Sequence, residues 1–122
     1  MTAPAPIADE TILLKCGADY WALFAYTDPT GAPIVITSPK MEIRAAADTS
    51  STLLCTSEGG SPTITYTQPA TNEVLFKIAG SVTKNQTTPT TGFWDAFATD
   101  ASGNSVCLGQ GTFQSIVNTT SL

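Results

Sequence analysis

The stretch FATDASGNSV (residues 97–106) is similar to an earlier segment of the chain, FAYTDPTGAPI (residues 24–34). This similarity decides which fold we expect. In each copy an aromatic segment leads into the pattern Asp-x-x-Gly. An aspartate at the first position of a type I turn accepts backbone hydrogen bonds two residues on, and a glycine at the fourth position supplies a positive φ. The pattern therefore predicts two β-hairpins with the same kind of turn. The turn residues are Asp28 and Gly31 in one copy, and Asp100 and Gly103 in the other.

Each predicted turn follows a strand that contains a tryptophan. Residues 19–27 (DYWALFAYT) and 92–99 carry aromatic or apolar side chains in both alternating sets, which favours strands covered on both faces. We expect both tryptophans in the core because each has apolar neighbours two residues on. Gly109 and Gly111 predict a bulge or bend inside the second return strand, at 105–117. The predicted return strands are 33–37 and 105–117.

The remaining segments predict an all-β sandwich in a single domain. KMEIRA (40–45) alternates apolar and charged residues with the period of a half-buried strand, which favours a strand over a short helix. Residues 80–92 predict a long polar loop, and no segment predicts a helix. Eight or nine short strands at this spacing are typical of a β-sandwich. The other expected strands are 10–15, 52–56, 63–67 and 73–79. The expected division is an extended N-terminal arm at 1–9, the sandwich at 10–118 and a tail at 119–122.

Composition argues against several classes of partner. Five basic and ten acidic residues give a net charge of −5, whereas nucleic acids and anionic membranes are bound through clustered Lys and Arg. We therefore expect neither nucleic acid nor membrane as a partner. The apolar runs are too short to span a bilayer, and no signal peptide is recognised, so we expect the chain to stay in a reducing compartment.

The side chains that carry most enzyme chemistry are scarce. The chain has no His, the usual general base at neutral pH, and its three cysteines match no zinc-binding pattern. We expect no catalytic residue, no metal and no cofactor. We also expect free thiols at Cys16, Cys55 and Cys107. A hydrolase that pairs the carboxylates of Asp95 and Glu42 is the enzymatic alternative.

Aromatic residues on both faces of two strands exceed what one small core can bury. We therefore expect a partner to cover part of the second apolar face. Asp95 lies between Phe93 and Phe97 in one alternating set, and a carboxylate there needs water or a donor, so this face is expected to be exposed or interfacial. The candidate interface residues are Tyr20, Phe24, Phe93 and Phe97.

The C-terminal segment GFWDAFATDASGNSVCLGQGTFQSIVNTT resembles the closing segment of a family of small bacteriophage and prophage proteins. The matching positions are Gly92, Trp94, Asp100, Gly103, Leu108, Gly111, Phe113 and, displaced by one residue, Ile116. The segment KCGADYWALFAYTDPTGAPIVITS resembles the opening of the same family. Its matching positions are Gly17, Asp28, Gly31, Pro33, Ile34 and Ile36. The resemblance covers about half of the chain, at its two ends, and departs from the family at 80–92, where relatives have a short helical turn.

The resemblance implies an immunoglobulin-like antiparallel β-sandwich in the virion, made in the host cytoplasm and similar to N-terminal modules of baseplate and upper-fibre proteins. It implies no catalytic residues. The expected function is a structural assembly module at the tail, baseplate or fibre attachment region, packed against other virion proteins as a homo-oligomer or a multi-copy assembly.

Two alternatives to this function stay open. One is a capsid decoration protein. The other is a carbohydrate-binding module, which would stack an exposed aromatic ring on a sugar. We do not expect glycan binding, because both tryptophans are expected in the core. The candidate stacking residues are Tyr20, Trp21, Tyr66 and Trp94.

Overall fold

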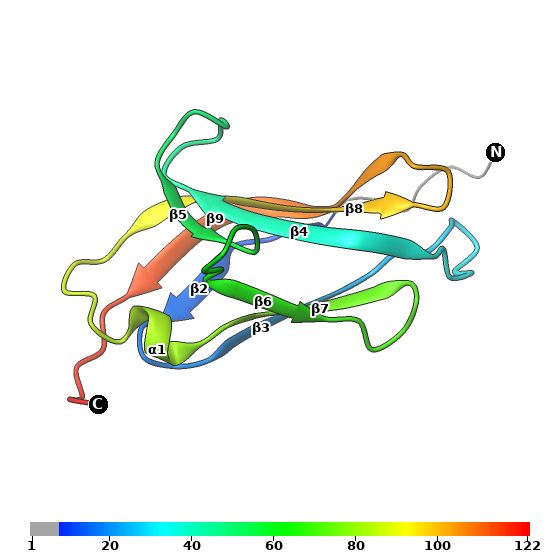
Figure 1. Cartoon of the computed structure of the whole chain (residues 1–122). Helices are drawn as coiled ribbons and strands as arrows, with labels where there is room; N and C mark the ends of the chain where they lie inside the picture. The colour runs from blue at the N-terminus through cyan, green and yellow to red at the C-terminus, as the bar shows by residue number, and fades with distance from the viewer. Residues whose placement is uncertain (1–7) are drawn as a thin grey trace.

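Two β-sheets pack face to face in the computed structural model, which describes residues 8–122 (Figure 1). The larger sheet contains β1 (Ala8–Asp9), β2 (Ile12–Lys15), β4 (Ile36–Arg44), β5 (Leu53–Thr56), β8 (Thr91–Asp100) and β9 (Ser105–Ile116). The smaller sheet contains β3 (Tyr20–Ala25), β6 (Ile64–Thr67) and β7 (Glu73–Ile78). One helical turn, α1 (Gly80–Thr83), follows β7. The predicted all-β sandwich is confirmed.

β8 and β9 form the centre of the larger sheet. Strands β9, β8, β4 and β5 lie side by side in that order, and β1 and β2 both pair with the other side of β9. In the smaller sheet β7 lies between β3 and β6. These pairings are antiparallel, except that β1 and β2 run parallel to β9. The parallel strands cover an edge of β9 whose N–H and C=O groups would otherwise be open to pairing.

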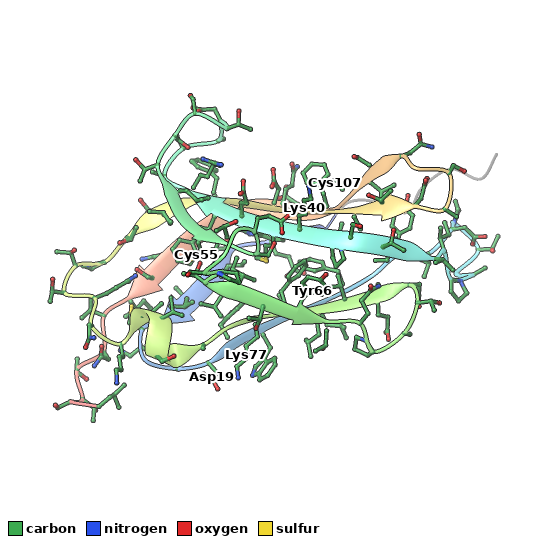
Figure 2. All side chains as sticks on the ribbon, viewed as in Figure 1. Asp19, Lys40, Cys55, Tyr66, Lys77 and Cys107 are labelled. Atoms are coloured by element: carbon green, nitrogen blue, oxygen red, sulfur yellow. The ribbon has the colours of Figure 1, made fainter. Side chains whose placement is uncertain are left out.

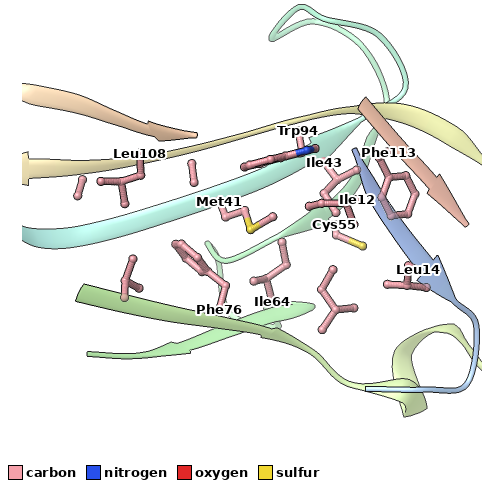
Figure 3. Close-up of a cluster of buried hydrophobic side chains, with 14 of the residues drawn as sticks. Ile12, Leu14, Met41, Ile43, Cys55, Ile64, Phe76, Trp94, Leu108 and Phe113 are labelled. Atoms are coloured by element: carbon pink, nitrogen blue, oxygen red, sulfur yellow. The ribbon is translucent and has the colours of Figure 1, made fainter. Parts of the chain in front are cut away.

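Alternate side chains of both sheets fill the space between them (Figure 3). β7 contributes Val74, Phe76 and Ile78, and β4 contributes Met41 and Ile43, each at most 2 % exposed. Burying a side chain of this size stabilises the fold by about 1.5–3 kcal/mol. The same alternation confirms that residues 40–44 of KMEIRA lie in a strand, β4, and not in a helix.

The hairpin predicted at the second Asp-x-x-Gly turn is confirmed. β8 and β9 pair as antiparallel neighbours on either side of this turn. The carboxylate of Asp100 accepts hydrogen bonds from the backbone N–H groups of Ser102 and Asn104, both at 2.9 Å. Gly103 has φ 82°, the conformation that the turn requires.

The first Asp-x-x-Gly turn has the same local structure but does not close a hairpin. The carboxylate of Asp28 accepts hydrogen bonds from the N–H groups of Thr30 at 2.9 Å and Ala32 at 3.0 Å, and Gly31 has φ 89°. However, β3 before the turn pairs with β7, whereas β4 after it pairs with β8. The ladder next to the turn stops after one isolated bridge. The predicted hairpin is therefore wrong, and this turn carries the chain from one sheet to the other.

In place of the strands expected at 33–37 and 40–45, the structure has one strand, β4, which begins at Ile36 and ends at Arg44. Residues 33–35 lie before it and belong to no strand. The pairing of β4 with β8 shifts register between Thr37 and Lys40, and Ser38 there has φ 50°. The physical reason is Pro39, which has no N–H to donate to the ladder. The strand therefore bends at this point and continues, instead of ending in a loop.

The loop expected at 80–92 begins with the helical turn α1. The backbone N–H of Gly80 donates to Asp19 Oδ1 at 2.8 Å, and Thr83 Oγ1 accepts a hydrogen bond from the N–H of Gly17 at 3.0 Å. A helix this short is not stable by itself. Hydrogen bonds with the turn between β2 and β3 hold it, and these contacts between distant segments explain why composition did not predict it.

The expected N-terminal arm at 1–9 falls partly outside the described residues, because residues 1–7 are not among them. Ala8 and Asp9 form β1 and pair with β9, so these two residues belong to the sandwich. The expected tail at 119–122 lies beyond β9 and contains no strand. Among residues 8–122, no helix has the length and apolar character of a membrane span.

Trp94 connects the N-terminal strands to the core. Its side chain is 4 % exposed, and its indole N–H donates to the carbonyl oxygen of Glu10 at 3.0 Å. Glu10 lies between β1 and β2 and also donates its backbone N–H to the Gln110 carbonyl at 3.0 Å. Because a buried indole N–H needs a partner, this hydrogen bond fixes where the chain enters the sheet.

Replacement of single glycines by alanine tests the turns and the N-terminal pairing. A Cβ at Gly31 or Gly103 would meet no atom within 4 Å, so the cost comes from the positive φ alone, about 1 kcal/mol. A Cβ at Gly111 would overlap the backbone of Glu10. We therefore expect Gly111→Ala to lower the melting temperature more than Gly31→Ala or Gly103→Ala. Thermal melts measure all three, and a Gly111→Ala variant as stable as the parent would contradict the close approach of Glu10.

Candidate functional site

β8 presents two aromatic side chains on the outer face of the larger sheet. Phe93 is 42 % exposed and Phe97 is 38 % exposed. Asp95 lies between them on the same face, whereas Trp94 and Ala96 are buried. The structure therefore places Phe93 and Phe97 in solvent, as their alternation with buried residues suggests. Their role as an interface stays a prediction.

The aromatic residues expected on the exposed face of β3 lie on its inner face instead. Tyr20 and Phe24 pack against the core, and the Phe24 ring centroid is 5.6 Å from that of Trp94. The outward set of β3 contains Trp21 and Leu23, which are 53 % and 57 % exposed. Trp94 is in the core as expected, but Trp21 is not. Because both alternating sets of β3 are apolar, the sequence carries no signal that distinguishes them.

A groove of about 470 Å³ lies beside Phe93 on the outer face of the larger sheet. Its lining comes from β4, β8 and β9, from Asp9, and from the loop at 45–52. That loop joins β4 to β5 and projects away from the sheet (Figure 1). The charged lining residues are Asp9, Glu42, Arg44, Asp48 and Asp95. Four carboxylates and one guanidinium leave the groove with a net negative charge.

Arg44 connects the base of this loop to the sheet. One guanidinium nitrogen donates to the Ser51 carbonyl oxygen at 2.8 Å, and the other is 3.0 Å from Glu42 Oε1. The second carboxylate oxygen of Glu42 accepts a hydrogen bond from the Thr56 hydroxyl at 3.1 Å. Both oxygens of Glu42 are therefore engaged, and the ion pair positions one wall of the groove.

Asp95 lies opposite Glu42 on β4 and opposite Gln110 on β9. Burial raises the pKa of the Asp95 carboxyl, the carboxylate of Glu42 raises it further, and Arg44 acts in the opposite direction. The structure thus brings together the two carboxylates considered for a hydrolase. Since Glu42 is held by Arg44 and Thr56, the arrangement resembles a structural ion pair next to a carboxyl whose pKa is raised. Among the described residues, no three His, Cys, Asp or Glu side chains gather closely enough to hold a metal ion.

Cys107 lies on the same outer face, opposite Phe97 (Figure 2). Burial raises the pKa of its thiol, and its sulfur lies 3.4 Å from the Gly109 carbonyl oxygen. Cys16 and Cys55 are buried. A thiol whose pKa is raised is a weak nucleophile at neutral pH, so the arrangement gives Cys107 no chemical activation.

Replacement of Asp95 by asparagine should stabilise the protein at neutral pH. The folded-state pKa of Asp95 is raised above its unfolded value, so ionisation disfavours the folded state, fully so above the folded pKa. This penalty disappears as the pH falls below the unfolded value of about 3.9. We expect Asp95→Asn to raise the melting temperature at pH 7 and to have no such effect near pH 3. A decrease at pH 7 would contradict this account of the site.

Comparison with known proteins supports the fold and no narrower assignment. No family model and no curated protein matches the chain. Solved structures with a similar fold include a mutant of the SrpA adhesin from Streptococcus sanguinis, with a TM-score of 0.60 and 16 % identity over 98 % of this chain. This chain spans 60 % of that adhesin chain.

The titin M3 domain is also similar, with a TM-score of 0.51 and 17 % identity. The match covers 94 % of this chain and 98 % of the titin domain. At such identities the likeness shows the fold alone. The chain therefore has an immunoglobulin-like β-sandwich fold, as the sequence resemblance implied.

Proposed function

We propose that this chain is a structural, non-enzymatic module of a bacteriophage virion, bound to other virion proteins near the tail, baseplate or fibre attachment region. The resemblance of both ends of the sequence to small phage and prophage proteins supports the virion location. The immunoglobulin-like fold is compatible with an assembly role, although folds of this kind serve many functions.

The observation that carries the proposal is the exposed pair Phe93 and Phe97 on β8, of which Phe93 lines a groove with a net negative charge. Aromatic side chains are enriched in protein interfaces, where their rings bury a large apolar area. A partner that fits this surface presents apolar side chains to the two rings and Lys or Arg to the groove. Such charge complementarity favours one orientation of docking.

The location of the protein in particles tests the virion assignment. Phage particles are purified from the bacterial cells that carry the gene for this chain. They are separated into heads and tails, and each fraction is analysed by mass spectrometry. We expect the chain in the tail fraction. Its presence in heads would favour the capsid decoration protein instead, and its absence from both fractions would overturn the proposal.

Removal of the two exposed rings tests whether other virion proteins bind at this surface. We expect Phe93→Ser combined with Phe97→Ser to reduce incorporation into particles at least about tenfold, since interface aromatics dominate binding. The melting temperature should stay close to that of the parent. Val82→Ser is the matched control, because Val82 lies on α1 and is 40 % exposed. Normal incorporation of the double variant would show that partners bind elsewhere.

A carbohydrate-binding module is a second candidate because Trp21 is 53 % exposed. Sugars stack on exposed aromatic rings. Trp94 is 4 % exposed, so acrylamide quenching of tryptophan fluorescence reports mainly on Trp21. For this candidate, glycans should protect Trp21 from the quencher. If a panel of glycans leaves the quenching unchanged, the carbohydrate-binding function is ruled out.

A further inference from the structure

The outer face of the smaller sheet is a second exposed surface, on the opposite side of the sandwich from Phe93. The register of β3 and β7 arranges its side chains in three rows. The rows are Trp21 with Lys77, Leu23 with Leu75, and Ala25 with Glu73. We call these six residues the β3–β7 face. Trp21 and Leu23 are largely exposed, and the three β7 residues are half-buried.

The two ends of the β3–β7 face differ in size and in charge. At one end the Lys77 ammonium lies 4.7 Å from the Trp21 ring centroid and 3.7 Å from Asp19 Oδ2. Figure 2 shows Lys77 and Asp19 together on the outer side of the smaller sheet. At the other end lie the small side chain of Ala25 and the carboxylate of Glu73. Within residues 8–122, Glu73 takes part in no ion pair.

We propose that the β3–β7 face binds a second copy of this chain about a twofold axis that runs across the strands, over the row of leucines. Rotation about this axis reverses the strand direction and keeps each strand over the same strand of the other copy. Trp21 then faces Ala25 of the second copy, and Lys77 faces Glu73 of the second copy. Each leucine faces its own equivalent at the centre. The interface is therefore isologous.

This geometry satisfies both the shapes and the charges of the face. The large indole lies over a small methyl group, which favours close packing between the sheets. Each dimer contains two Lys77–Glu73 pairs of opposite charge. An axis along the strands, midway between β3 and β7, would instead place Lys77 over Trp21 and Glu73 over Ala25 of the second copy, so that neither charge would face an opposite charge. Of the two axes, the first pairs opposite charges, so the charge pattern favours it.

The size of the face indicates a weak dimer. Its two strands, of six residues each, cover about 10 Å by 20 Å. This is less than the roughly 800 Å² per partner of a standard stable interface. We therefore expect a dissociation constant in the micromolar range or weaker, with the dimer favoured where many copies are held close together. The inference concerns the isolated chain and does not depend on the proposed virion role.

Charge reversal at the two ends tests the dimer and its axis together. Sedimentation velocity over a range of protein concentrations measures the dissociation constant of the parent, Lys77→Glu and Glu73→Lys. Each variant alone would place two like-charged pairs in its dimer, so we expect the dissociation constant to rise at least about tenfold. An equimolar mixture of the two variants restores two pairs of opposite charge. We expect the mixture to dimerise about as well as the parent.

Two controls keep the outcome specific. Lys40→Glu makes the same charge change on the larger sheet, where the Lys40 side chain is 62 % exposed, and should leave the dissociation constant unchanged. Leu23→Ser should abolish the dimer without lowering the melting temperature of dilute protein, because Leu23 is 57 % exposed. A parent chain that stays monomeric at millimolar concentration would overturn the proposal. So would a mixture that dimerises no better than its two components.

Discussion

The alternation of β8 is the constraint on which the rest of the structure depends. β8 pairs with β4 on one side and with β9 on the other, so its register sets the register of both. Trp94 points inward and Asp95 points outward. A shift of one residue would expose the indole and bury a carboxylate, and burying an unpaired charge is very unfavourable. The hydrogen bond from Trp94 to Glu10 extends the same constraint to the N-terminal strands.

The two outer faces of the sandwich have different chemical character. The face of the larger sheet carries exposed phenylalanine rings beside a groove with excess negative charge. The face of the smaller sheet carries Trp21 and Leu23 with one charge of each sign, on Lys77 and Glu73. The first pattern suits a partner with a basic surface, and the second suits a copy of itself. A sandwich that engages different neighbours on opposite faces fits the assembly role that we propose.

Features that depend on neighbouring residues could be predicted from the sequence. Asp28 and Asp100 accept the expected turn hydrogen bonds, because those bonds span four residues or fewer. The all-β class follows from strand periodicity and frequent turns. Part of the candidate site was also predictable. Asp95 alternates with Trp94 and Ala96, so its carboxylate identifies the outward set of β8, and Phe93 and Phe97 belong to the same set. Local chemistry was sufficient in each of these cases.

The tertiary structure alone decided which strands are partners and which face of β3 is buried. Identical Asp-x-x-Gly turns close a hairpin after β8 and cross between sheets after β3, because a turn does not specify the partners of the strands that flank it. On β3 both alternating sets are apolar, so packing against Phe76 and Trp94 places Phe24 inside and leaves Trp21 in solvent. The sequence by itself determined most of the strands and the local structure of the two Asp-x-x-Gly turns. Burial between residues distant in the chain determined their arrangement and the surfaces left for partners.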